Sequence, residues 1–212
     1  MAVALVAAAF FGCSREASNG APPRAAPVAA PDSFEVTFAT SRGDVVVRAH
    51  RNWAPRGADR LYALVRAGYY DDTRFFRVLD GFMAQFGAAG DPDVGRQWSD
   101  STIPDDPVTQ SNVRGMVTFA SAGPDTRTTQ LFINTADNAR LDGMGFAPVG
   151  SVVRGMEAVD SLHSGYGEGA PMGGGPDQAM IAREGNAYLD REFPRLDAIR
   201  GARITREWPG GS

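Results

Sequence analysis

The residue of this sequence whose type and position are best suited to chemistry is Arg77, which alternates with the apolar residues Phe76 and Val78. An arginine within an otherwise apolar strand requires either a charged partner or a ligand, because its guanidinium stays protonated and keeps five N–H donors. Two interpretations follow from the residues alone. Arg77 either forms an ion pair at the rim of a β-barrel or donates hydrogen bonds to a substrate in a groove.

Two neighbouring runs supply side chains that can line such a groove. In Phe82–Phe86, strand alternation predicts that Met83 and Gln85 share one face while Phe82 lies on the other, with Ala84 and Phe86. In 130–134, Gln130, Phe132 and Asn134 share a face, and Leu131 and Ile133 have the composition of a barrel interior. An aromatic side chain flanked by glutamines on adjacent strands indicates a lined groove, although a lone exposed aromatic residue is common.

Several kinds of chemistry are excluded or disfavoured. All 21 basic residues are arginine, which excludes a lysine Schiff base, and neither a G-x-S-x-G nor an H-E-x-x-H motif is present. One cysteine and two histidines, His50 and His163, are too few for a typical zinc site, so we expect neither metal nor cofactor. The pairs Asp71-Asp72 and Asp105-Asp106 are interpreted as solvated turn residues, and the glycines of 165–175 as a mobile loop.

Composition predicts one globular domain. The chain has 212 residues, a hydrophobic content of 43% and a formal net charge of −4. Because no basic stripe is present, we expect no nucleic-acid partner, and we expect a monomer.

The N-terminal segment predicts export. Met1–Phe11 is an apolar run too short to span a bilayer, and Gly12-Cys13-Ser14 resembles the cleavage site of a bacterial lipoprotein precursor, with Cys13 lipidated. No basic residue precedes the run, so an ordinary cleaved signal or a meaningless apolar start remain alternatives. We expect a leader over 1–13, a flexible tether over 14–32, the folded domain over 33–209, and a periplasmic or cell-envelope location with membrane contact only through the lipid anchor.

Hydrophobic periodicity predicts many short strands and a few helices. A helix should begin at Pro55, bury Ala58, Leu61, Tyr62 and Val65, and end near Gly68. Polar segments at 87–114, 122–129 and 164–176 are expected to be loops. Strands are expected at 34–38, 45–49, 74–79, 82–86, 116–120, 131–134, 148–153 and 199–207, and further helices at 156–161 and 178–191.

Two long motifs resemble those of the cyclophilins, a family of peptidyl-prolyl cis/trans isomerases (rotamases). Phe75–Gln85 resembles the first family signature, and Phe119–Ile133 resembles the second. Leu141-Asp142-Gly143 and Gly150–Met156 match the stretch that follows. The resemblance implies a mainly β fold, a closed eight-stranded antiparallel barrel capped by helices, followed here by a C-terminal helical extension over Ser164–Arg195 that is similar to one in some bacterial members.

The resemblance also implies a role for each matching residue. Arg77 matches the catalytic arginine, and Gln85 a glutamine beside it. Proline-containing polypeptides are the implied substrates, and assistance to the folding of exported proteins is the implied purpose. The implied substrate-binding residues are Phe82, Met83, Phe132 and Leu141 around the proline ring, Ala120, Ser121, Ala122 and Gln130 along the peptide backbone, and Phe146 by a loose alignment.

Some positions depart from the family pattern. Ser121 stands where asparagine is commoner, and Arg140 where many eukaryotic members carry a tryptophan that contacts cyclosporin. The main alternative function is a proline-peptide-binding chaperone or scaffold without turnover. A hydrolase is disfavoured because neither histidine lies within the matching motifs.

Overall fold

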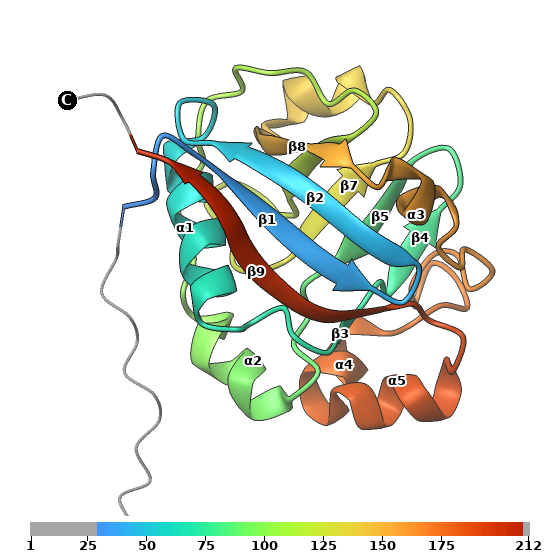
Figure 1. Ribbon diagram of the computed structural model, residues 1–212. Helices are drawn as coiled ribbons and strands as arrows, with labels where there is room; N and C mark the ends of the chain where they lie inside the picture. The colour runs from blue at the N-terminus through green and yellow to red at the C-terminus, as the bar shows by residue number, and fades with distance from the viewer. Residues whose placement is uncertain (1–28, 210–212) are drawn as a thin grey trace, which may run out of the picture.

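The computed structural model describes residues 29–209, and its centre is a single curved antiparallel sheet (Figure 1). The strand order is β3-β9-β1-β2-β8-β6-β7-β5-β4. The strands are β1 (Ser33–Thr40), β2 (Gly43–His50), β3 (Thr73–Arg74), β4 (Arg77–Leu79), β5 (Met83–Phe86), β6 (Met116–Phe119), β7 (Leu131–Asn134), β8 (Pro148–Arg154) and β9 (Ala198–Trp208).

The prediction of a closed eight-stranded barrel is wrong: the sheet has nine described strands and curls into an open half-barrel. Its two edge strands, β3 and β4, follow one another in the chain and are joined by Phe75 and Phe76 alone. Among the described strands, β3 pairs only with β9 and β4 only with β5, so the two edge strands form no ladder with each other and the sheet stays open. The predicted mainly β, antiparallel character is confirmed.

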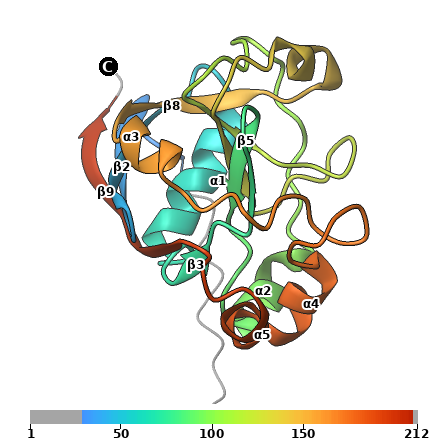
Figure 2. The ribbon, with the colours of Figure 1, turned by 90° about the vertical axis from the view of Figure 1, so that its right-hand side faces the viewer.

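Helices flank the sheet, and they are α1 (Pro55–Arg66), α2 (Pro92–Ser99), α3 (Met156–Asp160), α4 (Gln178–Glu184) and α5 (Asn186–Glu192), with a 3₁₀ helix, η1 (Ala139–Met144). Figure 2 shows α1 lying between strands β2 and β9 on one side and β5 on the other. The predicted apolar stripe of α1 is confirmed, since Ala58, Leu61, Tyr62 and Val65 are all buried.

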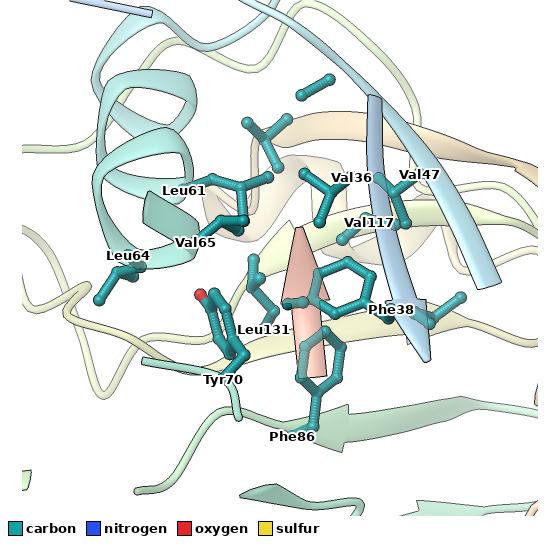
Figure 3. Close-up of a cluster of buried hydrophobic side chains, with 14 of the residues drawn as sticks. Val36, Phe38, Val47, Leu61, Leu64, Val65, Tyr70, Phe86, Val117 and Leu131 are labelled. Atoms are coloured by element: carbon teal, nitrogen blue, oxygen red, sulfur yellow. The ribbon is translucent and has the colours of Figure 1, made fainter. Parts of the chain in front are cut away.

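The main core fills the curve of the sheet (Figure 3). Alternation on β1 buries Phe34, Val36 and Phe38, and the Phe38 ring packs edge-on against Tyr70 and Phe86 at centroid distances of 5.7 and 5.4 Å. A fully buried aromatic or leucine side chain contributes about 1.5–3 kcal/mol each to folding. The strand predictions for Leu131 and Ile133 are confirmed, because both lie in this core.

Element boundaries differ from the predictions where tertiary contacts decide them. The expected strand 74–79 is divided into β3 and β4, and the expected helix 178–191 breaks at Gly185, whose φ of 58° ends α4. The expected loop 87–114 contains α2, which starts with an Asp91 side chain that accepts a hydrogen bond from the Asp93 amide, followed by Pro92 at the first helical turn.

Asp106 also corrects the interpretation of Asp105-Asp106 as solvated turn residues. Its carboxylate is fully buried and accepts hydrogen bonds from the amides of Arg56 and Gly57 at 3.1 and 2.9 Å. These amides belong to the first turn of α1, which has no side-chain cap of its own. Arg127, 3% exposed, pairs with the same carboxylate at 3.1 Å.

The leader, Cys13 and most of the expected tether lie outside the described residues. Within the described part of the expected tether, Ala30 is buried and its amide donates to Asp59 at 2.8 Å. Within 29–209, no helix has the length and apolar character needed to cross a membrane.

Candidate active site

Three adjacent strands place Arg77, Gln85 and Phe132 in one row. The β4–β5 ladder pairs Arg77 with Gln85, and the β5–β7 ladder pairs Gln85 with Phe132. Their side chains lie on the face opposite the main core, because their strand neighbours Val78, Ala84 and Ile133 belong to that core.

A chain of side-chain hydrogen bonds follows this row. Arg77 Nη1 donates to Gln85 Oε1 at 3.1 Å, and Gln85 Nε2 donates to Gln130 Oε1 at 2.8 Å. Gln130 Nε2 in turn donates to Gln178 Oε1 at 3.1 Å, at the start of α4. Gln85 is only 7% exposed, and its side-chain oxygen and nitrogen both form hydrogen bonds within the protein.

An apolar cluster, which we call the Met83 cluster, lies beside the Arg77 guanidinium. Arg77 Nη1 lies 3.8 Å from Met83 Sδ, and Arg77 Cζ lies 5.9 Å from the centre of the Phe82 ring. Phe132 and Phe146 pack edge-to-face at a centroid distance of 5.8 Å. The cluster consists of buried Met83, Phe132 and Leu141 with half-buried Leu79, Phe82, Ala120 and Phe146.

The prediction from alternation that Phe82 points away from Met83 is wrong. Phe82 lies in the turn before β5, where strand periodicity does not apply, and it joins Met83 in the cluster. The grouping of Phe82, Met83, Phe132 and Leu141 implied by the cyclophilin resemblance agrees with their positions. Phe146, placed by a loose alignment, lies in the same cluster.

A buried polar network that sequence analysis missed holds the walls of the Met83 cluster. Asn112, which is fully buried, donates to the carbonyl of Phe146 and to Asp142 Oδ1, both at 2.8 Å. Asn138 donates to the carbonyl of Phe82 at 2.8 Å. Burial acts to raise the pKa of Asp142, but hydrogen bonds from Ser111 and Asn112 outweigh it and lower that pKa. No local pattern marks these residues, because their partners are distant in sequence.

The expected backbone-binding residues lie at the edge of the cluster. The Ala120 amide donates to the carbonyl of Gln130 at 2.9 Å, and the Ala122 amide to Thr126 Oγ1 at 2.8 Å. Ser121 is half-buried between them. The amides of Ala120 and Ala122 already form hydrogen bonds within the protein. Pairing of a peptide backbone with residues 120–122 therefore stays a prediction.

The second contact of Arg77 is an ion pair with Glu168, which sequence analysis did not identify. Arg77 Nε and Nη2 donate to Glu168 Oε1 and Oε2, both at 2.6 Å. The hydrogen bonds from Arg77 lower the pKa of the Glu168 carboxyl, so it is ionised at neutral pH. The ion-pair interpretation of Arg77 is therefore confirmed. Donation of hydrogen bonds to a substrate stays a prediction, which the apolar surface beside the guanidinium favours.

Neither histidine contributes to the site. His50 stacks on Trp53 at a centroid distance of 4.2 Å, and burial together with Arg48 lowers its pKa. His163 packs edge-on against Tyr166, at the start of the extension. Within 29–209, no group of three or more His, Cys, Asp or Glu residues is arranged to hold a metal ion.

Comparison with known proteins defines the class. The family described as "Cyclophilin type peptidyl-prolyl cis-trans isomerase/CLD" matches residues 35–181, which is more than half of the chain. The chain therefore belongs to the cyclophilin family and is a peptidyl-prolyl cis-trans isomerase, as predicted.

Individual relatives agree with this assignment. The chain is 34% identical over 135 residues to peptidyl-prolyl cis-trans isomerase CYP18-1 of Arabidopsis thaliana, covering 61% of this chain and 82% of the relative. It is 32% identical over 136 residues to peptidyl-prolyl cis-trans isomerase B of Escherichia coli K12, covering 60% and 82%.

A solved structure agrees in fold. A cyclophilin-type isomerase from Cryptosporidium parvum aligns with a TM-score of 0.61 at 21% identity, covering 83% of this chain and 99% of that one. A second structure of the same protein, in the presence of the dipeptide Ala-Pro, aligns with a TM-score of 0.60.

Proposed function

We propose that this isomerase accelerates rotation about X-Pro peptide bonds in exported polypeptides and so assists their folding, with Arg77 as its catalytic residue. The observation that carries the proposal is the position of the Arg77 guanidinium, with Nη1 3.8 Å from Met83 Sδ at the edge of the Met83 cluster. A proline ring seated on that cluster has its nitrogen within reach of a permanently charged donor.

The reaction requires a donor that acts in the transition state. Rotation of an amide has a barrier of roughly 18–20 kcal/mol because it removes resonance, and the twisted proline nitrogen carries a localised lone pair. A hydrogen bond from the guanidinium to that lone pair exists only in the twisted state. Such differential binding lowers the barrier.

The Met83 cluster supplies the other half of the mechanism. Apolar side chains hold the ring while the preceding carbonyl swings, and they exclude water, whose hydrogen bonds to that carbonyl favour the planar amide. The segment 120–122 and Gln130 are proposed to align the peptide backbone. No covalent bond breaks in this reaction, so it requires no nucleophile, metal or cofactor.

Replacement of Arg77 tests the assignment. Arg77→Ala should lower kcat/KM for an Ala-Pro peptide by on the order of 10²–10³, as expected for the loss of one donor to transition-state charge. The measurement is peptide isomerisation by NMR exchange, with the folded state checked by circular dichroism. Arg203→Ala, which removes an exposed arginine of β9, is the matched control.

Two outcomes separate the alternatives. If folded Arg77→Ala keeps the parent rate, Arg77 is not the catalytic residue. If the parent binds proline peptides without accelerating their isomerisation, the protein acts as a peptide-binding chaperone, and the family activity has been lost.

Export and lipid attachment are part of the same proposal, supported by the apolar run Met1–Phe11 followed by Cys13. In a bacterial host, the parent should fractionate with membranes, and Cys13→Ala should be soluble in the periplasm or accumulate unprocessed. Retention of both proteins in the cytosol contradicts export. Release of both as soluble exported proteins contradicts only the lipid anchor.

A further inference from the structure

The extension, Ser164–Arg195, is the part of the molecule that the isomerase function leaves without a role. It follows α3, and Figure 1 shows its orange segment beside β4, before α4 and α5. Figure 2 shows the same segment passing beside β5. Two side chains of the extension join the chain of side-chain hydrogen bonds that begins at Arg77. They are Glu168, bonded to Arg77, and Gln178, bonded to Gln130.

The extension has its own apolar anchor directly beside Arg77. Phe76, the residue before Arg77, is 2% exposed and packs in a second core of extension residues. Asn186, at the start of α5, adds a hydrogen bond to the carbonyl of Asp72 at 2.8 Å. This core consists of Phe76 with Ile181, Tyr188 and Leu189, flanked by Ala88, Met180, Phe193 and Leu196.

The loop that carries Glu168 is built to hold that residue in place. The amide of Gly175 donates to the carbonyl of Glu168 at 2.8 Å, and the amide of Gly169 donates to Glu168 Oε1 at 2.9 Å. A Cβ at Gly175 would lie 2.8 Å from the same carbonyl oxygen, and one at Gly173 would collide with it. These glycines, interpreted from sequence as a mobile loop, are explained by close approach of the backbone to Glu168.

Glu168 and Met83 contact different nitrogens of the Arg77 guanidinium. The Glu168 carboxylate accepts hydrogen bonds from Arg77 Nε and Nη2. Arg77 Nη1 lies beside Met83 Sδ and donates to Gln85. A guanidinium has five N–H groups, so one on Nη1 and one on Nη2 are not used by these oxygen acceptors. The carboxylate therefore fixes the guanidinium without occupying the donor nearest the proposed proline site.

We propose that Glu168 is a positioning residue, through which the extension holds the Arg77 guanidinium in its catalytic orientation before substrate binds. Gln178 holds the other end of the hydrogen-bonded chain, because it accepts from Gln130, which in turn accepts from Gln85. The inference rests on the proposed catalytic role of Arg77. Its physical basis is preorganisation: a long arginine side chain loses much rotational freedom when it orders, and here that ordering precedes the reaction.

The opposite role for Glu168 is an autoinhibitory contact that must break before turnover. It predicts the opposite change in activity when the Glu168 charge is removed. If Glu168 blocked Arg77, removing its charge would raise kcat/KM. If Glu168 positions Arg77, removing its charge lowers kcat and leaves substrate binding nearly unchanged, because the Met83 cluster is untouched.

The test compares Glu168→Gln with the parent in the full-length protein. NMR exchange spectroscopy on an Ala-Pro peptide at several concentrations gives kcat and KM separately. We expect Glu168→Gln to lower kcat on the order of tenfold with KM changed by less than about twofold, and Glu168→Asp to retain more activity than Glu168→Gln. Glu184→Gln is the matched control, because Glu184 lies in the same extension and pairs with Arg191 at the surface.

A spectroscopic measurement distinguishes positioning from a merely structural role. In ¹⁵N-labelled protein, the Arg77 Nε–H signal should be protected from hydrogen exchange in the parent and in Glu184→Gln, and should lose protection in Glu168→Gln while backbone signals of the sheet stay in place. An unchanged or increased kcat in Glu168→Gln overturns the inference. Full activity in Arg77→Ala instead overturns the proposed function, so the two failures are distinguishable.

Discussion

Among single residues, Arg140 was expected from the sequence to replace the tryptophan that contacts cyclosporin in many eukaryotic cyclophilins, and it lies beside the Met83 cluster. Its guanidinium carbon lies 4.7 Å from the centre of the Phe82 ring, at the rim of the Met83 cluster. A charge at this rim must lose hydration when a largely apolar macrocycle binds. The isomerase should therefore bind cyclosporin weakly, and Arg140→Trp should increase the affinity by about tenfold, which corresponds to ~1.4 kcal/mol.

Titration of isomerisation activity with cyclosporin measures this effect. Proline-peptide turnover should change less than drug affinity, since Arg77 and its partners keep their contacts. Tight inhibition of the parent, or no gain from Arg140→Trp, would show that other residues set drug affinity, and the first candidate is the segment Gly143–Phe146, which contributes Phe146 to the cluster.

Among the elements, helix α1 depends most on a distant side chain. Asp106 caps its first turn and is paired with buried Arg127, so removing the carboxylate leaves two amides without their acceptor and leaves Arg127 with one carboxylate partner, Asp105, at 3.0 Å. Asp106→Ala should lower the free energy of unfolding by about 2–4 kcal/mol. Urea unfolding measures it, and Asp93→Ala, an exposed first-turn residue of α2, should cost less than about 1 kcal/mol. Equal losses in the two variants would exclude a special role for Asp106.

In the molecule as a whole, Asp197 connects the turn between β1 and β2 to His163, the residue before the extension. Its Oδ1 accepts hydrogen bonds from Ser41 Oγ and Arg42 Nε at 2.6 and 2.7 Å, and its Oδ2 accepts one from the His163 amide at 2.7 Å. Burial acts to raise the pKa of Asp197, but these three donors outweigh it, so its pKa lies below the ordinary value of 3.8.

The lowered pKa of Asp197 predicts that its contribution to stability is lost in acid. Because the pKa is lower in the folded state, Asp197 stabilises the protein above pH 3.8, and the stabilisation is lost as the pH falls through the folded-state pKa. Asp197→Asn should be less stable than the parent near neutral pH, by about 1–3 kcal/mol, and the difference should shrink below pH 3.8. Unfolding free energies measured from pH 2.5 to 7 in both proteins test this, and a difference independent of pH would contradict it.

Local pattern was sufficient for most of the regular elements and for part of the site, but it missed α2 and the break between α4 and α5. The 3.6-residue period of α1 and the alternation of β1 predicted which side chains are buried, and the alternation of β7 predicted which of its side chains enter the main core, because periodicity depends only on neighbouring residues. The same alternation placed Gln85 and Phe132 on the outer face. It was wrong for Phe82, because a turn interrupts the strand before β5.

The sequence by itself determined a mainly β, antiparallel isomerase of the cyclophilin family, since the motifs around Arg77 and Phe132 are long, local and dense. Only the tertiary structure decided that the sheet stays open, that Asp106 caps α1 and that Glu168 holds Arg77. Each of these depends on a contact between segments far apart in the chain: Asp106 is 49 residues from Gly57, and Glu168 is 91 residues from Arg77. No local period encodes such contacts, because the packing of the whole chain determines which distant residues meet.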